Sequence, residues 1–149
     1  MTEQGLWSTL TRHCPNELRM NRIETGIMLG VSDIEYVGAK ANGWLELKVG
    51  VIGHTHLRLG HEVTREQAIW LLEHNRRTIP LRSWLLVGIH APCAPRRWQQ
   101  FLLGTPSMAA LLAMPKPKDR PTWAELRGSK LVRLYRTTSE VLQAINQGG

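Results

Sequence analysis

The sequence predicts an α/β fold in which a small mixed β-sheet is flanked by helices. Three observations support this class. Two short strand-like runs are joined by the turn-like residues 40–43, a capped helix begins near Thr64, and a continuous apolar run covers residues 83–89. A helix placed between a hairpin and a buried strand is the element order of an α/β fold, in which the last strand reaches the sheet through a crossover.

The first half of the chain supplies a helical region and three strands. Residues 5–24 are expected to be helical, with Pro15 interrupting the segment and a second helical piece starting at residues 15–17. The glycines at 26 and 30 then separate this region from strands expected at about 32–38 and 44–50. Loose alternation within residues 51–59 predicts a third short strand.

The middle of the chain carries a helix and a buried strand. Thr64 and Gln67 form a capping box, in which Thr64 accepts from the N3 amide and Gln67 reaches back. The helix that follows is predicted to end near Arg76. Its expected buried residues are Ala68, Leu71 and Leu72, with Ile69 as a further candidate. The apolar run 83–89 suits a strand that is covered on both faces.

The last third is expected to complete the same domain. Residues 96–103 are a short helix candidate, and the three prolines within residues 114–121 predict a loop. Residues 131–136 alternate like an edge strand. Ser139 is expected to cap a terminal helix, whose apolar side is Val141, Leu142 and Ile145. We therefore predict one domain over 1–149, with a core at about 5–90 and an extension over 91–149 that completes the fold.

The charge balance favours a polyanionic partner. The 149 residues contain 19 Lys and Arg against 12 Asp and Glu, for a net charge of +7 and a pI near 10.1. Most of the basic residues are arginine, whose planar fork suits phosphate. No apolar run approaches the about 20 residues that span a bilayer, and the first residues lack a signal-peptide pattern. We expect a cytoplasmic, intracellular protein without membrane association, in which Cys14 and Cys93 are ordinary thiols.

One pattern of charged residues stands out in the predicted hairpin. Asp33 opens the first strand, and the second strand contains Glu46-Leu47-Lys48. Side chains alternate along a strand, so Glu46 and Lys48 share one face with Trp44. The hairpin connection brings Asp33 toward the same edge. Two acidic groups beside a lysine can hold a hard divalent cation and leave a positive charge for a reacting anion.

These residues resemble the PD-(D/E)XK nuclease superfamily, which has the restriction-endonuclease-like fold. The strings at 22–24, 30–33, 43–48 and 66–70 look like small phage-encoded nucleases of the Holliday-junction-resolvase type. The resemblance covers about residues 17–90. The chain departs from the family pattern where Ser32 precedes the aspartate in place of proline.

The resemblance implies a role for each matched residue. Asp33 and Glu46 would ligate Mg²⁺ or Mn²⁺, with the carbonyl of Leu47 completing part of the shell. Glu24 matches the family's extra acidic residue on the first helix and would act as a catalytic or metal-binding carboxylate; Glu17 is a second candidate for this position. Lys48 would orient the attacking water and offset the charge that builds on the phosphate.

The implied function is a Mg²⁺-dependent endonuclease that hydrolyses DNA phosphodiester bonds, by cutting branched DNA or by nicking duplex DNA. The alternative is a non-catalytic basic DNA-binding module whose acidic residues only form salt bridges. Resolvases place two active sites on one junction, which implies a homodimer; a monomer that nicks is the open alternative. The likeness to phage nucleases suggests a phage-encoded protein that acts in the host cell.

Further polar and aromatic residues are candidates for DNA contacts. The nucleic-acid candidates are Arg76, Arg77, Arg96, Arg97 and Trp98, the last as an exposed stacking residue. The other strand and helix tryptophans, Trp44, Trp70 and Trp84, are expected in the core. The histidines at 54, 56 and 61 leave a zinc site open, although a DNA-facing or loop position explains them as well. Gln67 is explained by its cap, with a contact to the site or to DNA as an alternative.

Overall fold

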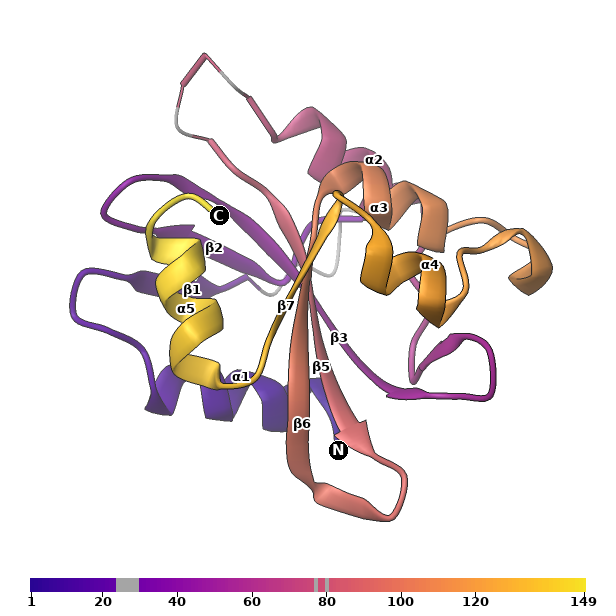
Figure 1. Cartoon of the computed structure of the whole chain (residues 1–149). Helices are drawn as coiled ribbons and strands as arrows, with labels where there is room; N and C mark the ends of the chain where they lie inside the picture. The colour runs from indigo at the N-terminus through magenta and orange to yellow at the C-terminus, as the bar shows by residue number, and fades with distance from the viewer. Residues whose placement is uncertain (24–29, 77, 80) are drawn as a thin grey trace.

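A computed structural model describes residues 1–23, 30–76, 78–79 and 81–149. The chain forms a seven-stranded sheet with helices on both faces (Figure 1), as the sequence predicts for an α/β fold. Helices α1 (Glu3–Arg12) and α5 (Thr138–Asn146) pack on one face, and α2 (Arg65–Glu73) and α3 (Pro106–Leu112) on the other. None of the described helices is long and apolar enough to cross a bilayer.

The sheet is mixed, with the order β1-β2-β3-β5-β6-β7 and with β4 paired to β3. The β3 and β5 strands are parallel and the other pairs are antiparallel. Helix α2 makes the crossover between the parallel strands. The strand bounds are β1 Arg19–Arg22, β2 Ile34–Val37, β3 Asn42–Ile52, β4 Leu57–Leu59, β5 Trp84–Ala91, β6 Ala94–Gly104 and β7 Val132–Tyr135.

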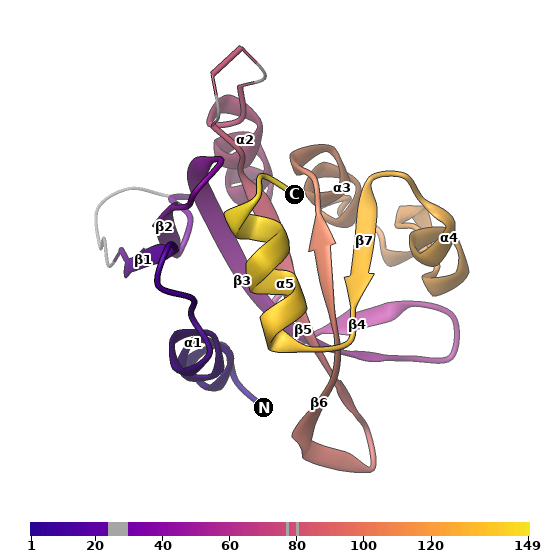
Figure 2. The ribbon, with the colours of Figure 1, turned by 60° about the vertical axis from the view of Figure 1, so that its left-hand side comes forward.

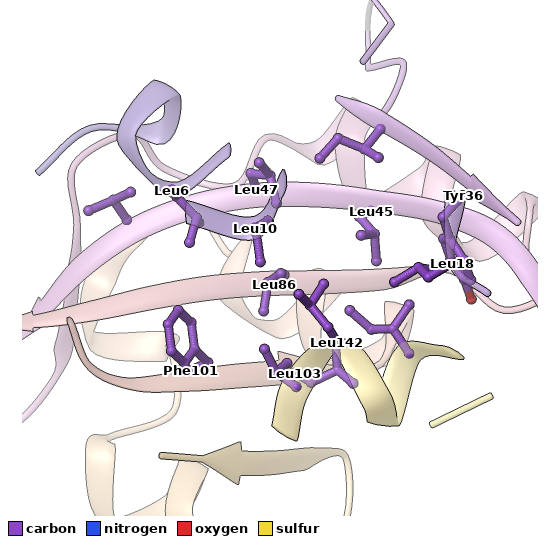
Figure 3. Close-up of a cluster of buried hydrophobic side chains, with 14 residues drawn as sticks. Leu6, Leu10, Leu18, Tyr36, Leu45, Leu47, Leu86, Phe101, Leu103 and Leu142 are labelled. Atoms are coloured by element: carbon purple, nitrogen blue, oxygen red, sulfur yellow. The ribbon is translucent and has the colours of Figure 1, made fainter. Parts of the chain in front are cut away.

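The first core lies between the sheet and helices α1 and α5 (Figures 2 and 3). Leu6 and Leu10 are one helical turn apart and fully buried, so α1 presents one apolar stripe to the sheet. The terminal helix presents its predicted residues Val141, Leu142 and Ile145 in the same way. Its cap differs from the prediction. The N-cap is Thr137, which forms a capping box with Glu140.

The second core lies on the opposite face under α2 and α3, and α4 (Trp123–Gly128) joins it through Leu126. The predicted capping box of α2 is confirmed, and Ala68 and Leu71 are buried. Leu72 and Ile69 are exposed at 46% and 41%, contrary to the prediction. Residues 68 and 71 already point at the sheet, and only one stripe of a surface helix can do so.

Two segments predicted to be helical are strands. Residues 19–22 form β1 against β2, so α1 ends at Arg12 and the predicted helix over 5–24 is wrong beyond that point. The segment 96–103 lies within β6, where consecutive residues 101–103 are buried because both faces of the sheet are covered. Strand pairing overrides the weak helical spacing in both segments. Helices α3 and α4 were not predicted, whereas 114–121 is a loop with one 3-10 turn and β7 is an edge strand, as expected.

Gly30 fixes the approach of the chain to α2. Its φ is +78°, and a Cβ atom placed on it would lie 2.6 Å from the backbone carbonyl of Glu66. Only glycine combines this dihedral with so close a contact. The segment that leads into β2 is thereby held against the first turn of α2.

We expect Gly30→Ala to lower the free energy of unfolding by roughly 2 kcal/mol or more, because it adds a clash to a strained dihedral. Gly128→Ala is the matched control, since a Cβ there meets nothing within 4 Å. That change, at the end of a helix, should be neutral or stabilising by about 0.5–1 kcal/mol. Urea unfolding of both variants measures the difference, and equal stabilities would contradict the account of Gly30.

Candidate active site

The candidate site occupies a gap along one edge of β3. On this edge β2 pairs as far as Leu45, and β4 begins to pair at Gly50, so residues 46–49 have no strand neighbour there within the part of the chain that the structure describes. The carboxylate Oδ2 of Asp33 accepts the N–H of Leu47 at 2.9 Å. The N–H of Gly60 donates to the carbonyl of Val49 at 2.8 Å. A side-chain carboxylate and a loop amide therefore take the place of a strand.

Asp33 is positioned by its neighbours on the chain. It directly precedes β2, and its own carbonyl accepts the N–H of Ile23 at 2.8 Å. Together with the close contact of Gly30 with α2, this bond fixes the backbone of Asp33 on both sides. The short hairpin then brings its carboxylate onto β3, as the sequence predicted.

Glu46 and Lys48 lie side by side on the same face of β3, which confirms the predicted alternation. They are exposed at only 1% and 4%, and Lys48 Nζ lies 3.5 Å from Glu46 Oε1. Trp44 shares this face and packs edge-on against Trp70 of α2, with ring centroids 5.5 Å apart. The two charges are thus buried within the fold and do not form a solvated surface pair.

Gln67 connects the first turn of α2 to the site. Its Oε1 accepts the N–H of Thr64 at 2.9 Å, which completes the capping box. Its Nε2 donates to Glu46 Oε1 at 2.6 Å. The cap orients the amide so that the remaining N–H points at the buried carboxylate. The two roles considered for Gln67 from the sequence, cap and site contact, are therefore both present.

The carboxyl group of Glu46 is held in an unusual electrostatic state. Its pKa is raised to about 8, chiefly by burial and secondarily by the negative charge of Asp33, while Lys48 acts in the opposite direction. Glu46 Oε1 is bound by Gln67, whereas the buried Oε2 has no hydrogen-bond partner within the described residues. A buried carboxylate oxygen without a partner is costly unless a ligand or a proton satisfies it.

Glu3 is a site residue that the sequence analysis missed. It lies in the first turn of α1, and its Oε1 is 4.0 Å from Lys48 Nζ and 3.4 Å from His61 Nδ1. No local pattern marks it, since it reaches β3 only through the packing of α1 on the sheet. Glu24, expected to be the helix carboxylate, lies outside the described residues; the helix meant to carry it ends at Arg12. Glu17 lies in the turn between α1 and β1.

The donor set suits a hard cation. Asp33 and Glu46 offer carboxylate oxygens, and the carbonyl of Leu47 faces the gap because N–H and C=O of one strand residue point to the same side. Among the described residues, no group of three or more His, Cys, Asp or Glu side chains could hold a metal. Two carboxylates with retained waters are nevertheless a common ligand set for Mg²⁺, and the unpartnered Oε2 of Glu46 fits it.

The predicted nucleic-acid residues are scattered. Arg96 and Arg97 are exposed on the hairpin that joins β5 and β6 and extends beyond the sheet (Figure 1), and Arg76 is exposed after α2. Arg77 lies outside the described residues. Trp98 is not the exposed residue that the sequence suggested. It is half-buried against the first core, and its indole N–H donates to Thr9 Oγ1 at 3.1 Å.

Comparison with known proteins gives one structural likeness. No family model matches the sequence, and no curated protein matches it. A solved structure of Hjc, a Holliday junction resolvase from Archaeoglobus fulgidus, is similar over 95% of this chain and 97% of its own, with 12% identity and a TM-score of 0.46. Hjc is a Holliday junction resolvase, which is the type of nuclease that the sequence motifs of this chain resemble. A likeness this low carries no argument, so the fold rests on the strand pairing described above.

The raised pKa of Glu46 predicts a pH-dependent stability. The folded protein keeps the proton up to about pH 8, whereas an unfolded glutamate loses it near 4.5, so in the metal-free protein stability falls as pH rises between these values. Glu46→Gln removes the titration and should flatten this part of the curve. Urea unfolding at pH 5, 7 and 9 measures it, with the exposed Glu35→Gln as control. If the stability of wild type and of Glu46→Gln depends on pH in the same way, the raised pKa of Glu46 is contradicted.

Gln67 can be separated from its cap by substitution. Gln67→Glu keeps an acceptor for Thr64 but replaces the donor to Glu46 with a negative charge, so its destabilisation should grow from pH 5 to pH 9. Glu125→Gln is the matched control because Glu125 holds the same cap position in α4, away from the site. Thermal unfolding should show a pH-dependent loss only for Gln67→Glu. If Gln67→Glu loses a similar amount of stability at pH 5 and at pH 9, the contact of Gln67 with Glu46 is contradicted and only its role in the cap remains.

Proposed function

We propose that this chain is a metal-dependent endonuclease that hydrolyses phosphodiester bonds of DNA. The observation that carries the proposal is the meeting of Asp33, Glu46 and Lys48 at the gap in β3, with one oxygen of Glu46 buried and unpartnered in the described structure. Paired carboxylates beside a fixed ammonium group suit the binding and cleavage of a phosphodiester. Branched DNA is the preferred substrate, and nicking of duplex DNA is the alternative.

Asp33, Glu46 and the Leu47 carbonyl are the residues that would hold Mg²⁺, with Mn²⁺ as a substitute. The bound ion would supply Lewis-acid stabilisation of the phosphate and lower the pKa of a bound water. Glu46 must lose its proton to act as a ligand, and its raised pKa means that this proton is released above its ordinary range. Glu24 remains a predicted additional ligand from the sequence.

Lys48 supplies a fixed positive charge to the reaction. Its ammonium group is held between Glu46 at 3.5 Å and Glu3 at 4.0 Å, and its side chain is almost fully buried. A charge positioned in advance stabilises negative charge that develops on phosphate oxygens without a cost of reorganisation. The same N–H groups can orient the attacking water. Glu3 thus acts as a positioning residue for Lys48.

The partner follows from charge and from the reaction. A net charge of +7 with arginine as the main basic residue favours a nucleic acid over a neutral or acidic substrate. A homodimer would place two sites on one branched molecule, and a monomer would suffice for nicking. These two forms differ in the products that they release from a four-way junction.

Cleavage assays test the proposal. We expect Asp33→Asn and Lys48→Met to lower the cleavage rate by roughly 100-fold or more, since the first removes a proposed metal ligand and the second removes the positive charge proposed to face the reacting phosphate, while DNA binding changes little. Lys40→Met and Glu35→Gln, which replace exposed residues of neighbouring turns and strands, should cut like wild type.

The substrates for this assay are four-way junctions, flaps, nicked duplexes and plain or supercoiled duplexes, each with Mg²⁺ and with Mn²⁺. Preferential cutting of branched forms supports the preferred substrate. DNA binding without cutting of any substrate would overturn the nuclease and favour a basic DNA-binding module. Full activity of Lys48→Met would overturn the role given to the site.

A further inference from the structure

A second polar feature of the structure is a pocket of about 250 Å³. It is formed between β4 and the segment that joins α3 to α4, which lie side by side (Figures 1 and 2). The N–H of Trp123 donates to the carbonyl of Thr55 at 2.8 Å and ties the two parts together. The lining residues that matter below are His56, Arg58, Glu62 and Arg120.

Arg120 is fixed in the wall of this pocket. Its Nε donates to the carbonyl of Met114 at 2.7 Å, and one terminal nitrogen lies 3.0 Å from Glu62 Oε1. The arginine side chain is only 17% exposed, whereas that of Glu62 is 65% exposed. The guanidinium is therefore oriented by the fold, and its carboxylate partner lies on the solvent side.

The Arg58 side chain and one ring nitrogen of His56 have no hydrogen-bond or ion-pair partner among the described residues. Arg58 is exposed, lies over Gly53 where any side chain would clash with it, and forms no ion pair within the described residues. His56 Nδ1 lies 2.8 Å from Thr55 Oγ1, and its Nε2 is buried without a partner in the same part of the structure. Both residues line the pocket, so its wall contains hydrogen-bonding groups without a partner in the described structure.

The charges in and around the pocket sum to an excess of positive charge. Glu62 is the one carboxylate of the lining, and Arg120 already pairs with it. Glu125, which lies near His56, is engaged in the α4 capping box through the N–H of Thr122 at 3.0 Å. Arg58 is left without a countercharge among the described residues, and a tetrahedral anion that meets two guanidinium forks suits this arrangement.

The pocket is linked to the candidate active site through the residues that follow β4. Glu62 follows His61 in the chain, and His61 Nδ1 is 3.4 Å from Glu3, which in turn is 4.0 Å from Lys48. This series of contacts connects the segment that carries Glu62 to the residue proposed to face the reacting phosphate.

We propose that this pocket binds a backbone phosphodiester of the DNA strand to one side of the cleaved bond, with Arg58, Arg120 and His56 as its donors. The phosphate takes the place of Glu62 on Arg120. The inference rests on the proposed function for the identity of its ligand. It assigns to the 117–121 segment and to β4 a part in positioning DNA, separate from the residues that perform cleavage.

Binding measurements on the full chain test this assignment. We measure affinity for a four-way junction and for a duplex by fluorescence anisotropy with EDTA present and at several salt concentrations. Arg58→Gln should weaken binding roughly tenfold and reduce the salt slope by about 1. Glu62→Gln should tighten binding, because it frees Arg120 and removes a repulsive charge. Arg133→Gln, an exposed arginine on β7, is the matched control and should leave both quantities unchanged.

Neutral methylphosphonate linkages then locate the phosphate. We expect that a methylphosphonate at one position near the scissile bond weakens DNA binding by wild type but not by Arg58→Gln. We call this dependence of one change on the other coupling. Loss of affinity in Arg58→Gln without coupling at any position would overturn the proposal. So would equal effects of Arg58→Gln and Arg133→Gln, or weaker binding by Glu62→Gln.

The same experiments separate this inference from the nuclease. If wild type cleaves DNA but shows no methylphosphonate coupling, the proposed nuclease function is retained and the phosphate-binding role of the pocket is overturned. Coupling without cleavage of any substrate supports the pocket and overturns the nuclease. Calorimetric titration with inorganic phosphate tests whether the pocket binds a free phosphate group and not a phosphate of the DNA backbone. Binding of free phosphate that Arg58→Gln abolishes, with no coupling on DNA, would assign the pocket to a small phosphorylated ligand and overturn the proposal.

Discussion

The candidate site depends on one hydrogen bond, from the N–H of Leu47 to the carboxylate of Asp33. A central strand cannot leave its amides unpaired in the interior, and here β2 ends before Leu47 while β4 starts after it. A carboxylate from the residue that opens β2 satisfies the amide. The carboxylate of Asp33 thus takes the place of a strand carbonyl. It satisfies the amide of Leu47 and leaves an acidic group in the gap. The rest of the site is arranged around that opening.

Burial of Glu46 and Lys48 is the second constraint, and it is costly. Removing two charges from water is compensated only when they are paired and hydrogen-bonded. Lys48 meets two carboxylates, but Glu46 receives one amide donor and keeps an unpartnered oxygen in the described structure. The raised pKa of Glu46 follows from this burial, because the described residues do not fully satisfy its charged form. The buried pair therefore lowers the stability of the folded protein at this point of the sheet.

The sequence predicted the parts of the site that local patterns encode. Alternation placed Glu46 beside Lys48, the hairpin brought in Asp33, and the capping box located Gln67. Glu3 was not predictable, because its contact with Lys48 depends on how α1 packs on the sheet. The strands β1 and β6 were read as helices for a related reason. Their strand form comes from partners distant in sequence, against which local spacing is a weak signal.

The bond between Leu47 and Asp33 also has a dynamic consequence. Amides in the middle of a central strand usually exchange with solvent only when the whole domain unfolds. Leu47 donates to a carboxylate on a loop residue and not to a neighbouring strand, so its protection depends on that loop. Its exchange rate should follow the release of Asp33 while the amides that pair β3 with β5 stay protected. The exchange rate of the Leu47 amide hydrogen thus reports whether the carboxylate of Asp33 is in place on β3.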